Sequence, residues 1–310
     1  MRSTIILSSL ASLAAAAPAA APTPAPSSSS CASQTAQPGG YGPKSTNPDT
    51  AEAFLANQVY SNAASSAVTP PGYAQSFVNL QAATTTSNYL TYYDLQSYDP
   101  SVCKAKCDAV PGCTAFNLYF ERDPSVLPDA SACPNPSSFT NVKCSLWGTA
   151  LTPATATNSG QYRASFHVVI AGSNGYNRLP PAQPGFDGPT PLTGAIIAPD
   201  GSTYIGVRFQ AGSTLNTTFC ASECAATTAN DRSTPKADGT YMPCNFFNAW
   251  VGALGGVVDG THCAEYTQPW GKPYDTNYGQ MRGNQVYSVT QSYGYSLNPQ
   301  DSGKVSATNA

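Results

Sequence analysis

The stretch DPSVCKAKCDAVPGCTAFNLYFERDP (residues 99–124) places three cysteines within eleven positions and follows them with an alternating apolar run. Asp99 suits an N-cap and Pro100 suits the first helical position, so a helix is predicted that ends before the Pro-Gly pair. Cys103 and Cys107 stand four residues apart and therefore share one face of that helix. The period-two alternation of TAFNLYFE predicts a strand soon after the helix.

The same pattern recurs near residue 220, which makes it a repeat. Each copy has two cysteines four apart, a third cysteine that opens an apolar strand (CTAFNLY and CNFFNAW), and a fourth near an aromatic residue (KCSLW and HCAEY). The matched cysteines are Cys103, Cys107, Cys113 and Cys144 in the first copy and Cys220, Cys224, Cys244 and Cys263 in the second. A period of 117 residues is too long for a solenoid and predicts two tandem domains of like fold.

Other features of the two copies match less closely. Trp147 is matched with Tyr266 at a displacement of one position, and GQYRASFHVVI is matched with GNQVYSVTQSY. Between Cys224 and Cys244 the second copy has 19 residues, where the first copy has five. We therefore expect the second domain to carry an insertion after its helix.

Composition divides the chain into segments. We expect a signal peptide over 1–19, a disordered Pro/Ser/Ala-rich stalk over 20–50, a first domain over 51–174, a linker over 175–191, a second domain over 192–297 and a tail over 298–310. Further strands are expected at 89–95, 161–170, 203–209 and 285–290. One helix with several strands in each domain predicts the α+β class.

The N-terminal segment has the layout of a secretory signal peptide. One positive charge precedes the apolar run TIILSSLASLAAAA, and small residues favour cleavage near Ala19. The sequence has no second long apolar run, so no membrane span is expected. Loss of Arg2 leaves 13 of the 14 basic residues against 17 acidic ones, and no basic patch suggests a nucleic acid partner. We expect a secreted protein, extracellular or in the cell wall.

Cysteine spacing limits the chemistry of the cysteines. Zinc sites favour cysteine pairs with two-residue gaps, often with histidines, and the chain has only His167 and His262. A thioredoxin-like redox pair also needs a two-residue gap, whereas these gaps have three residues. Disulfides are the default in a secreted chain. No metal and no other cofactor is expected.

The helix with two cysteines, the Cys-x-Ala-Phe strand and the Cys-x-Leu strand together resemble the PAN/apple domain. The chain is similar to secreted fungal proteins with tandem PAN-like units. The resemblance implies two tandem PAN/apple-like domains, each a disulfide-bonded antiparallel sheet with one main helix. In that family the first helix cysteine pairs with the last cysteine, and the second pairs with the one that opens the Phe strand. The implied disulfides are Cys103–Cys144, Cys107–Cys113, Cys220–Cys263 and Cys224–Cys244.

Two cysteines lie outside the repeat. Cys31 belongs to the expected stalk, and Cys133 lies between the strand and the last cysteine of the first copy. The even total of ten suggests a Cys31–Cys133 bond that ties the stalk down. The alternative is an intermolecular bridge through Cys31, which would give a disulfide-linked oligomer.

Each copy also carries an Asn-x-aromatic pair, Asn117 with Tyr119 and Asn248 with Trp250. Aromatic rings with a nearby amide would suit a sugar-binding platform. Strand parity favours a core position instead, because the third cysteine of each copy lies on the same strand face and is tied to the helix. We therefore expect these four residues to point toward the helix, with Phe116 and its neighbours on the opposite face.

Candidate catalytic residues are sparse. The sequence has no G-x-S-x-G motif; His167 is expected to pack in an apolar strand, and His262 to be placed by the neighbouring disulfide. Glu121 and Asp123 would make a carboxylate pair of the glycosidase type, but a solvated turn is the favoured interpretation of Glu-Arg-Asp. No catalytic residue is predicted.

Asn216-Thr217-Thr218 is a sequon for N-glycosylation. It lies just before the second expected helix, whose N-cap we place at Thr217 or Thr218. An exposed start of a helix would leave room for a glycan on Asn216.

The resemblance also bears on function, because PAN/apple modules bind proteins or carbohydrates and do no chemistry. It implies a secreted, non-enzymatic protein that binds an extracellular polysaccharide or a glycoprotein. A structural cell-surface or extracellular-matrix protein is the alternative, and a secreted hydrolase is the weakest one.

Overall fold

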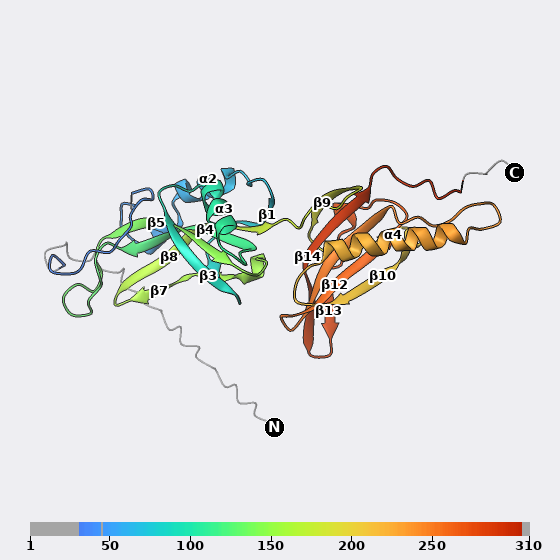
Figure 1. Ribbon diagram of the computed structural model, residues 1–310. Coiled ribbons are helices and arrows are strands. Elements are labelled where there is room, and N and C mark those ends of the chain that lie inside the picture. The colour runs from blue at the N-terminus through green and yellow to red at the C-terminus, as the bar shows by residue number, and fades with distance from the viewer. Residues whose placement is uncertain (1–30, 45, 306–310) are drawn as a thin grey trace, which may run out of the picture.

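The computed structural model describes residues 31–44 and 46–305, which form two six-stranded antiparallel sheets and one small two-stranded sheet (Figure 1). The expected signal peptide (1–19) and the N-terminal part of the expected stalk lie outside the described residues. Antiparallel sheets accompanied by few helices agree with the α+β class.

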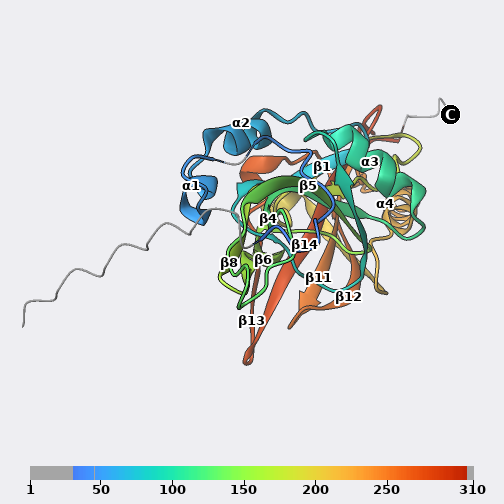
Figure 2. The ribbon, with the colours of Figure 1, turned by 90° about the vertical axis from the view of Figure 1, so that its left-hand side faces the viewer.

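The first sheet, the small two-stranded sheet and three helices come from residues 51–178. The elements are α1 (Ala51–Leu55), α2 (Gln58–Ser66), β1 (Tyr73–Leu80), β2 (Ala83–Thr84), β3 (Tyr89–Leu95), α3 (Pro100–Ala109), β4 (Ala115–Pro124), β5 (Ser138–Trp147), β6 (Ala156–Asn158), β7 (Gly160–Arg163) and β8 (Phe166–Arg178). Figure 2 shows α1, α2 and α3 on the same side of this sheet, where their buried residues share one core with the sheet.

The second sheet comes from residues 186–297 and is covered by one long helix (Figure 1). The elements are β9 (Phe186–Leu192), β10 (Tyr204–Ala211), α4 (Thr217–Ser233), β11 (Phe246–Leu254), β12 (Val257–Tyr266), β13 (Gly279–Arg282) and β14 (Gln285–Leu297). Short 3-10 turns occur at Pro153–Thr155, Gly201–Thr203 and Lys272–Tyr274.

The two sheets have the same strand order. The first runs β1-β8-β4-β5-β3 with β7 on β8, and the second runs β9-β14-β11-β12-β10 with β13 on β14. Each strand of one sheet therefore has a counterpart in the other, in the same order along the chain. The sequence repeat builds the same sheet twice.

The helix α3 begins and ends where the sequence predicts. The Asp99 side chain accepts a hydrogen bond from the Ser101 backbone nitrogen at 2.7 Å, and Pro100 is the first helical residue. In α4 the N-cap is Asn216, whose side chain accepts from the Phe219 nitrogen at 3.1 Å, rather than Thr217 or Thr218. An asparagine oxygen reaches the free nitrogens of the first turn as well as a hydroxyl does.

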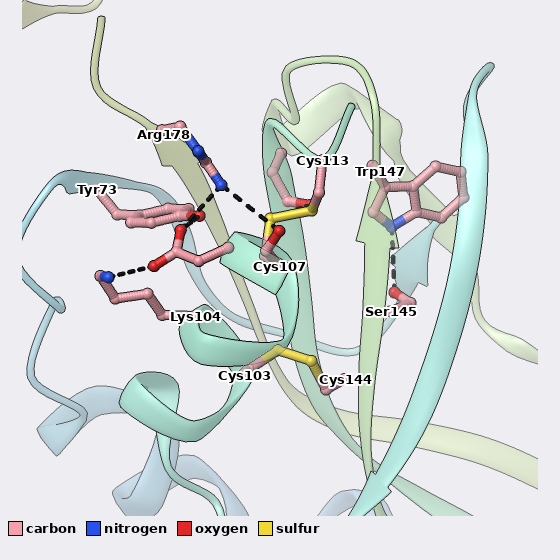
Figure 3. The surroundings of a disulfide bond; sticks show 11 residues. Tyr73, Cys103, Lys104, Cys107, Cys113, Cys144, Ser145, Trp147 and Arg178 are labelled. Atoms are coloured by element: carbon pink, nitrogen blue, oxygen red, sulfur yellow. Dashed lines mark hydrogen bonds and ion pairs between the residues drawn. A yellow bond between two sulfur atoms is a disulfide. The ribbon is translucent and has the colours of Figure 1, made fainter. Parts of the chain in front are cut away.

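The C-terminal turn of α3 is bound to the start of β1 and to the end of β8 (Figure 3). The Asp108 carboxylate accepts hydrogen bonds from the Tyr73 hydroxyl and from Arg178, each at 2.9 Å, and it also pairs with Lys104. Tyr73 opens β1 and Arg178 ends β8, so this contact fixes the helix over the edge of the sheet.

Five disulfides occur, and all ten cysteines take part in them. The bonds are Cys31–Cys133, Cys103–Cys144, Cys107–Cys113, Cys220–Cys263 and Cys224–Cys244. These are the pairs that the sequence suggests. Cys31 is bonded within the chain and leaves no thiol for an intermolecular bridge. Closing loops of about 40 residues, as two of the bonds do, restricts the unfolded chain by about 3–4 kcal/mol each.

In the central strands β4 and β11, the residues that face the helix are those that were expected on the other side of the sheet. Phe116, Leu118 and Phe120 share a buried cluster with the α3 cysteines, whereas Asn117 and Tyr119 point to the other face of the sheet. The parity argument failed because β4 begins at Ala115, after Cys113. Cys113 lies outside the strand, so alternation along β4 does not give the face on which this cysteine lies.

Residues 31–44, called the N-terminal arm below, are placed against the first domain instead of forming the expected disordered stalk. The Cys31–Cys133 bond holds one end. Backbone hydrogen bonds join Gln37 to the Ser125 oxygen and Gly42 to the Thr140 oxygen, both at 2.9 Å. Polar residues with few large apolar side chains can be ordered in this way because a disulfide and backbone pairing replace burial.

Asp49, also inside the expected stalk, is bound by a buried arginine. Arg122 is 2% exposed, and its Nη2 donates to the Asp49 carboxylate at 2.8 Å. The Ser138 backbone nitrogen donates to the same carboxylate at 2.8 Å. Burial alone would raise the pKa of Asp49, but the hydrogen bonds from Ser138 and Arg122 outweigh it and lower that pKa.

Two further segment limits differ from the prediction. The strand β8 continues to Arg178 and β9 starts at Phe186, so the connection between the sheets is shorter than 175–191. The tail expected over 298–310 is partly bound to the second domain. Asp301 accepts hydrogen bonds from the Tyr241 hydroxyl and from Arg232, and its backbone nitrogen donates to Asn245. The 19-residue insertion thus lengthens α4 and anchors residues 301–305.

The repeat is more regular than the sequence match suggests. Trp147 pairs with the first residue of β4 and Tyr266 with the first residue of β11, so they correspond without displacement. GQYR in β7 corresponds to GQMR in β13, which moves the downstream match by several residues. Gly160 and Gly279, which open these strands, have φ of 110° and 122°, and a Cβ on either would lie 2.0 Å from a backbone oxygen of the paired strand.

Candidate functional site

The asparagine of each Asn-x-aromatic pair is a structural residue. Asn117 is fully buried; its Oδ1 accepts from the Thr84 nitrogen at 2.8 Å, and its Nδ2 donates to the Ser173 hydroxyl at 2.8 Å and to the Asn174 oxygen at 2.9 Å. All its hydrogen-bonding groups are engaged within the protein. The amide therefore holds the crossing segment β2 against the sheet and is not available to a ligand.

Asn248 has the same environment in the second sheet. Its Oδ1 accepts from the Ile196 nitrogen at 2.9 Å, and its Nδ2 donates to the Ser292 hydroxyl at 2.8 Å and the Tyr293 oxygen at 3.2 Å. Ser292 of β14 occupies the place that Ser173 has in β8. The two asparagines are therefore not the ligand-binding amides of a sugar-binding platform. Each amide holds a loop against the sheet.

The aromatic residue of each pair lies on the sheet face opposite the helix and lines a cavity. Tyr119 is 8% exposed and borders a cavity of about 390 Å³ in the first domain. Trp250 is half-buried and borders a cavity of about 380 Å³ in the second. We call this side of each sheet the open face. Each open face therefore carries a cavity beside the aromatic residue of the pair, but the first cavity extends toward Glu121 and Asp123 at the end of β4, whereas the second extends toward Tyr266, which pairs with the start of β11.

A row of three side chains crosses each open face next to the cavity. In the first sheet Tyr119 on β4 pairs with Lys143 on β5, which pairs with Asp94 on β3. In the second sheet Trp250 on β11 pairs with His262 on β12, which pairs with Phe209 on β10. Corresponding positions thus hold an ion pair in one domain and aromatic rings in the other.

The row of the second sheet consists of stacked rings. Trp250 lies parallel to His262, with ring centroids 3.9 Å apart and an interplanar angle of 7°. Phe209 contacts the other side of His262 at 4.7 Å and is 52% exposed. The imidazole is therefore held between two aromatic rings, one of which is freely accessible to solvent.

His262 also has polar partners on this face. Its Nε2 lies 3.2 Å from Asp259 and 3.0 Å from the hydroxyl of Tyr287, which donates to Asp259 at 2.7 Å. Burial lowers the pKa of His262 although Asp259 opposes the shift. The imidazole is therefore neutral at neutral pH and serves as a stacking and hydrogen-bonding group. This packing, more than the adjacent disulfide, places the ring.

The cavity of the second domain has mostly apolar walls. It is bordered by Ile196, Ile197, Tyr204, Val207, Trp250 and Tyr266, among others. Tyr204 and Val207 on the edge strand β10 are 43% and 47% exposed. The Tyr266 hydroxyl donates to the Ile196 oxygen at 2.9 Å, which joins the connection after β9 to the floor of the sheet. The open face thus offers rings and aliphatic groups next to a recess.

The cavity of the first domain is charged by contrast. Glu121 and Asp123 lie within β4 and not in a solvated turn, and Glu121 borders the cavity beside Lys143. The sequence interpretation of Glu-Arg-Asp is corrected because β4 continues to Pro124 through pairing with β5. The middle residue, Arg122, points to the helix side and binds Asp49.

Other candidate residues lie away from these cavities. His167 is half-buried instead of packed in the core and stacks on the exposed ring of Tyr162 at 4.2 Å. Asn216 is exposed at the start of α4, and its Nδ2 donates to the Gln210 side-chain oxygen at 2.8 Å. Glycan attachment at Asn216 stays a prediction.

Residues 31–44 and 46–305, which the structure describes, contain neither a cluster of metal-ligating side chains nor a membrane-spanning helix. In that part of the chain no three His, Cys, Asp or Glu side chains are grouped to hold a metal ion. Within the same residues none of the helices has the length and apolar character needed to span a membrane.

The cross-strand rows are the features that sequence reasoning missed. Asp94 and Phe209 lie on strands that were expected, but their pairing with Lys143 and His262 depends on register. A signal was present, since Lys143 and His262 each directly precede the last cysteine of their copy. Comparison of the chain with protein-family models, curated proteins and solved structures gave no match.

Proposed function

We propose that this is a secreted binding protein that engages an extracellular polysaccharide, or the glycans of a glycoprotein, through the open faces of its two sheets. The PAN/apple-like character of the domains belongs to this proposal. Five disulfides support an oxidising, extracellular setting. The fungal origin implied by the resemblance is part of the same proposal.

One observation supports the proposal most. The ring row Phe209–His262–Trp250 stands beside an apolar cavity on the open face of the second sheet. Sugar rings have C–H-rich faces that pack against aromatic groups, while their hydroxyls need polar partners at the edge of the contact. Asp259 and the hydroxyl of Tyr287 provide such partners next to His262.

A non-catalytic role fits the carboxyl pair of the first domain. A glycosidase places its two carboxyl groups on opposite sides of the scissile bond, about 5–10 Å apart. Glu121 and Asp123 project from the same face of one strand and interact with each other directly. We therefore propose binding rather than hydrolysis. The structural-protein alternative was based mainly on an intermolecular bridge through Cys31, which is bonded to Cys133.

The test is retention on insoluble chitin, β-glucan and cellulose, with competition by soluble oligosaccharides. A Tyr204→Ala/Phe209→Ala variant removes two exposed rings of the open face and should lose about nine-tenths of the bound protein. Tyr278→Ala removes a ring that is 59% exposed but lies outside the row, and serves as the matched control. Equal retention of both variants, or no retention of the natural chain on any polymer, would refute the proposal.

A further inference from the structure

The charged cavity of the first domain lies on the open face of the first sheet, beside Tyr119. It measures about 390 Å³ and is bordered by side chains of β3, β4, β5 and β7 and by the N-terminal arm. The side chains that matter most are Tyr92, Asp94, Tyr119, Glu121, Asp123 and Lys143. Aromatic, acidic and basic groups thus meet in one recess large enough for a single sugar-sized group.

Lys143 is the central cation of this cavity. Its Nζ lies 2.8 Å from Asp94 and 3.8 Å from Glu121, and 4.6 Å from the centre of the Tyr92 ring. The lysine side chain is only 12% exposed, so its ammonium group is held in place by these contacts. Neighbouring carboxylates raise the pKa of Lys143 against the effect of burial, and the group stays charged.

One of the two carboxyl groups that β4 contributes to the cavity, that of Glu121, keeps its proton at neutral pH. The Asn141 amide nitrogen donates a hydrogen bond to the Asp123 carboxylate at 2.8 Å. Burial, together with the charge of Asp123, raises the pKa of Glu121 to about 8. Glu121 therefore keeps its proton at neutral pH and can donate a hydrogen bond.

The charges of the cavity then cancel at neutral pH. Asp94 and Asp123 are negative, Lys143 and Arg163 are positive, and Glu121 is neutral. An anionic ligand would be repelled by Asp94 and Asp123. A cationic ligand would be repelled by Lys143 and Arg163. An apolar ligand would cover Lys143 and the carboxylates without replacing their contacts with water. A neutral ligand that carries both donors and acceptors satisfies these groups.

The N-terminal arm forms one wall of the cavity. Gln37 and Pro38 border it, and the Gly40 nitrogen donates to the Asn141 Oδ1 at 2.7 Å. Asn141 thus joins the arm to Asp123 through its two amide atoms. Gly39 has a φ of 116°, and a Cβ there would lie 2.1 Å from the Asn141 oxygen, so this close approach needs glycine.

The geometry points to a ligand site in this cavity for one uncharged, hydroxyl-rich residue, such as a neutral sugar unit, with a wall that the Cys31–Cys133 disulfide holds in place. The inference rests on the proposed function, because it names a second subsite for the same class of ligand. It also accounts for the disulfide outside the repeat: the second domain has no arm and no corresponding bond. Arm and disulfide act as positioning elements of the site.

The test uses the full chain in the Tyr204→Ala/Phe209→Ala background, which removes the two exposed rings from the open face of the second domain. Calorimetric titration with chitohexaose, laminarihexaose and cellohexaose measures the first domain alone. At least one of these is expected to bind near pH 6, and Lys143→Met and Asp123→Asn should each weaken that binding about tenfold. Lys104→Met, on the helix side, is the control and should change nothing.

Protonation gives a readout that a merely structural role would not change. Above the pKa of Glu121 the cavity gains a negative charge beside Asp94 and Asp123, with Lys143 and Arg163 as the facing cations. Binding should therefore weaken about fivefold between about pH 6 and about pH 9. Glu121→Gln should keep the affinity of pH 6 and abolish this loss. A pH-dependent loss that persists in Glu121→Gln would contradict the assignment of the proton.

The arm is tested by Cys31→Ser/Cys133→Ser, which should weaken binding about tenfold while the other four disulfides preserve the sheets. Gln37→Ala, which trims the wall without touching a disulfide, should weaken it about threefold. Unchanged affinity in both variants would overturn the role of the arm.

Different results would refute the charged ligand site and the proposed function. If the natural chain is retained on a polymer through its ring row but the background variant binds none of the three hexasaccharides, the charged site is wrong and the proposed function stands. If neither assay shows binding, both are wrong. Binding that is identical in Lys143→Met would place the hexasaccharide elsewhere and overturn the site.

Discussion

The open faces of the two sheets are built on the same backbone but carry different chemistry. Asp94, Lys143 and Tyr119 of the first row correspond to Phe209, His262 and Trp250 of the second. The same holds for the neighbours: Glu121 corresponds to Gly252, where the hydroxyl of Tyr287 fills the space that a Cβ would occupy.

The opposite faces of the two sheets are alike. Phe116 stacks on Tyr176 at 4.7 Å, and Phe247 stacks on Tyr295 at 4.7 Å. Both stacks lie beneath helices that two disulfides attach to the sheet. Residues that maintain the fold are thus repeated, while residues on the open face have diverged. This contrast indicates that the open faces are where the two domains differ in what they contact.

The largest expected effect concerns the shared part of the structure. Asn117→Ala and Asn248→Ala each leave a backbone nitrogen, a hydroxyl and a backbone oxygen without their partner in a buried site. Each should lower the free energy of unfolding by about 3 kcal/mol. Chemical denaturation of the two variants, with the exposed Asn230→Ala as control, measures this. A loss in one domain but not in the other would break the structural equivalence.

The second prediction concerns a group that the second domain lacks. Folded Glu121 keeps its proton up to about pH 8, whereas an unfolded glutamate loses it near about pH 4.3, so the natural chain loses stability as pH rises between these values. Glu121→Gln cannot ionise, so its stability relative to that of the natural chain should increase over this range, by up to about 1.4 kcal/mol per pH unit. Thermal unfolding across pH checks it, with the exposed Glu52→Gln as control. A difference that does not grow with pH would contradict the buried, protonated carboxyl.

The third prediction concerns the anchor of residues before α1. Asp49→Asn removes the charge that faces buried Arg122 and should cost about 1.5 kcal/mol at neutral pH. Because the pKa of folded Asp49 is lowered, this stabilisation is present above about pH 3.9 and is lost as pH falls through the folded value. Urea unfolding at neutral and acidic pH measures the difference. The residue equivalent to Arg122 in the second sheet is Ala253, so this anchor belongs to the first domain alone.

The smallest expected effect on stability concerns the ends of the two rows on the open faces. Phe209→Ala and Asp94→Asn alter exposed or half-exposed ends of the two rows, and each should change the free energy of unfolding by less than about 1 kcal/mol. Denaturation curves close to those of the natural chain would show that these residues are not needed for stability. A loss of several kcal/mol in either variant would mean that the rows support the fold.

Much of the fold can be predicted from the cysteines. The spacing of two cysteines in each copy places them on one helix face, and their recurrence 117 residues later indicates two sheets. The resemblance to PAN/apple domains implies how the cysteines pair. Alternation locates β4 and β11, and caps locate α3 within a residue. These features are local in sequence, which is why they can be recognised without coordinates.

What could not be predicted depends on long-range register. The face on which Tyr119 lies cannot be counted from Cys113, because that cysteine lies before the start of the strand. The contact of Lys143 with Asp94 joins strands that are nearly fifty residues apart in sequence. The sequence suggests the Cys31–Cys133 bond but not the order of the rest of the arm, which comes from contacts with distant residues such as Asn141 and not from the arm's own composition.

Hydrogen–deuterium exchange of the full chain tests the central claim most directly. The chain is compared alone and with a saturating amount of the hexasaccharide that it binds. Our account predicts slower exchange in β10, β11 and the segment 195–204 of the second domain, and in β3, β4 and the arm of the first, with α3 and α4 unchanged. Slower exchange confined to α3 and α4, or none on either open face, would contradict it.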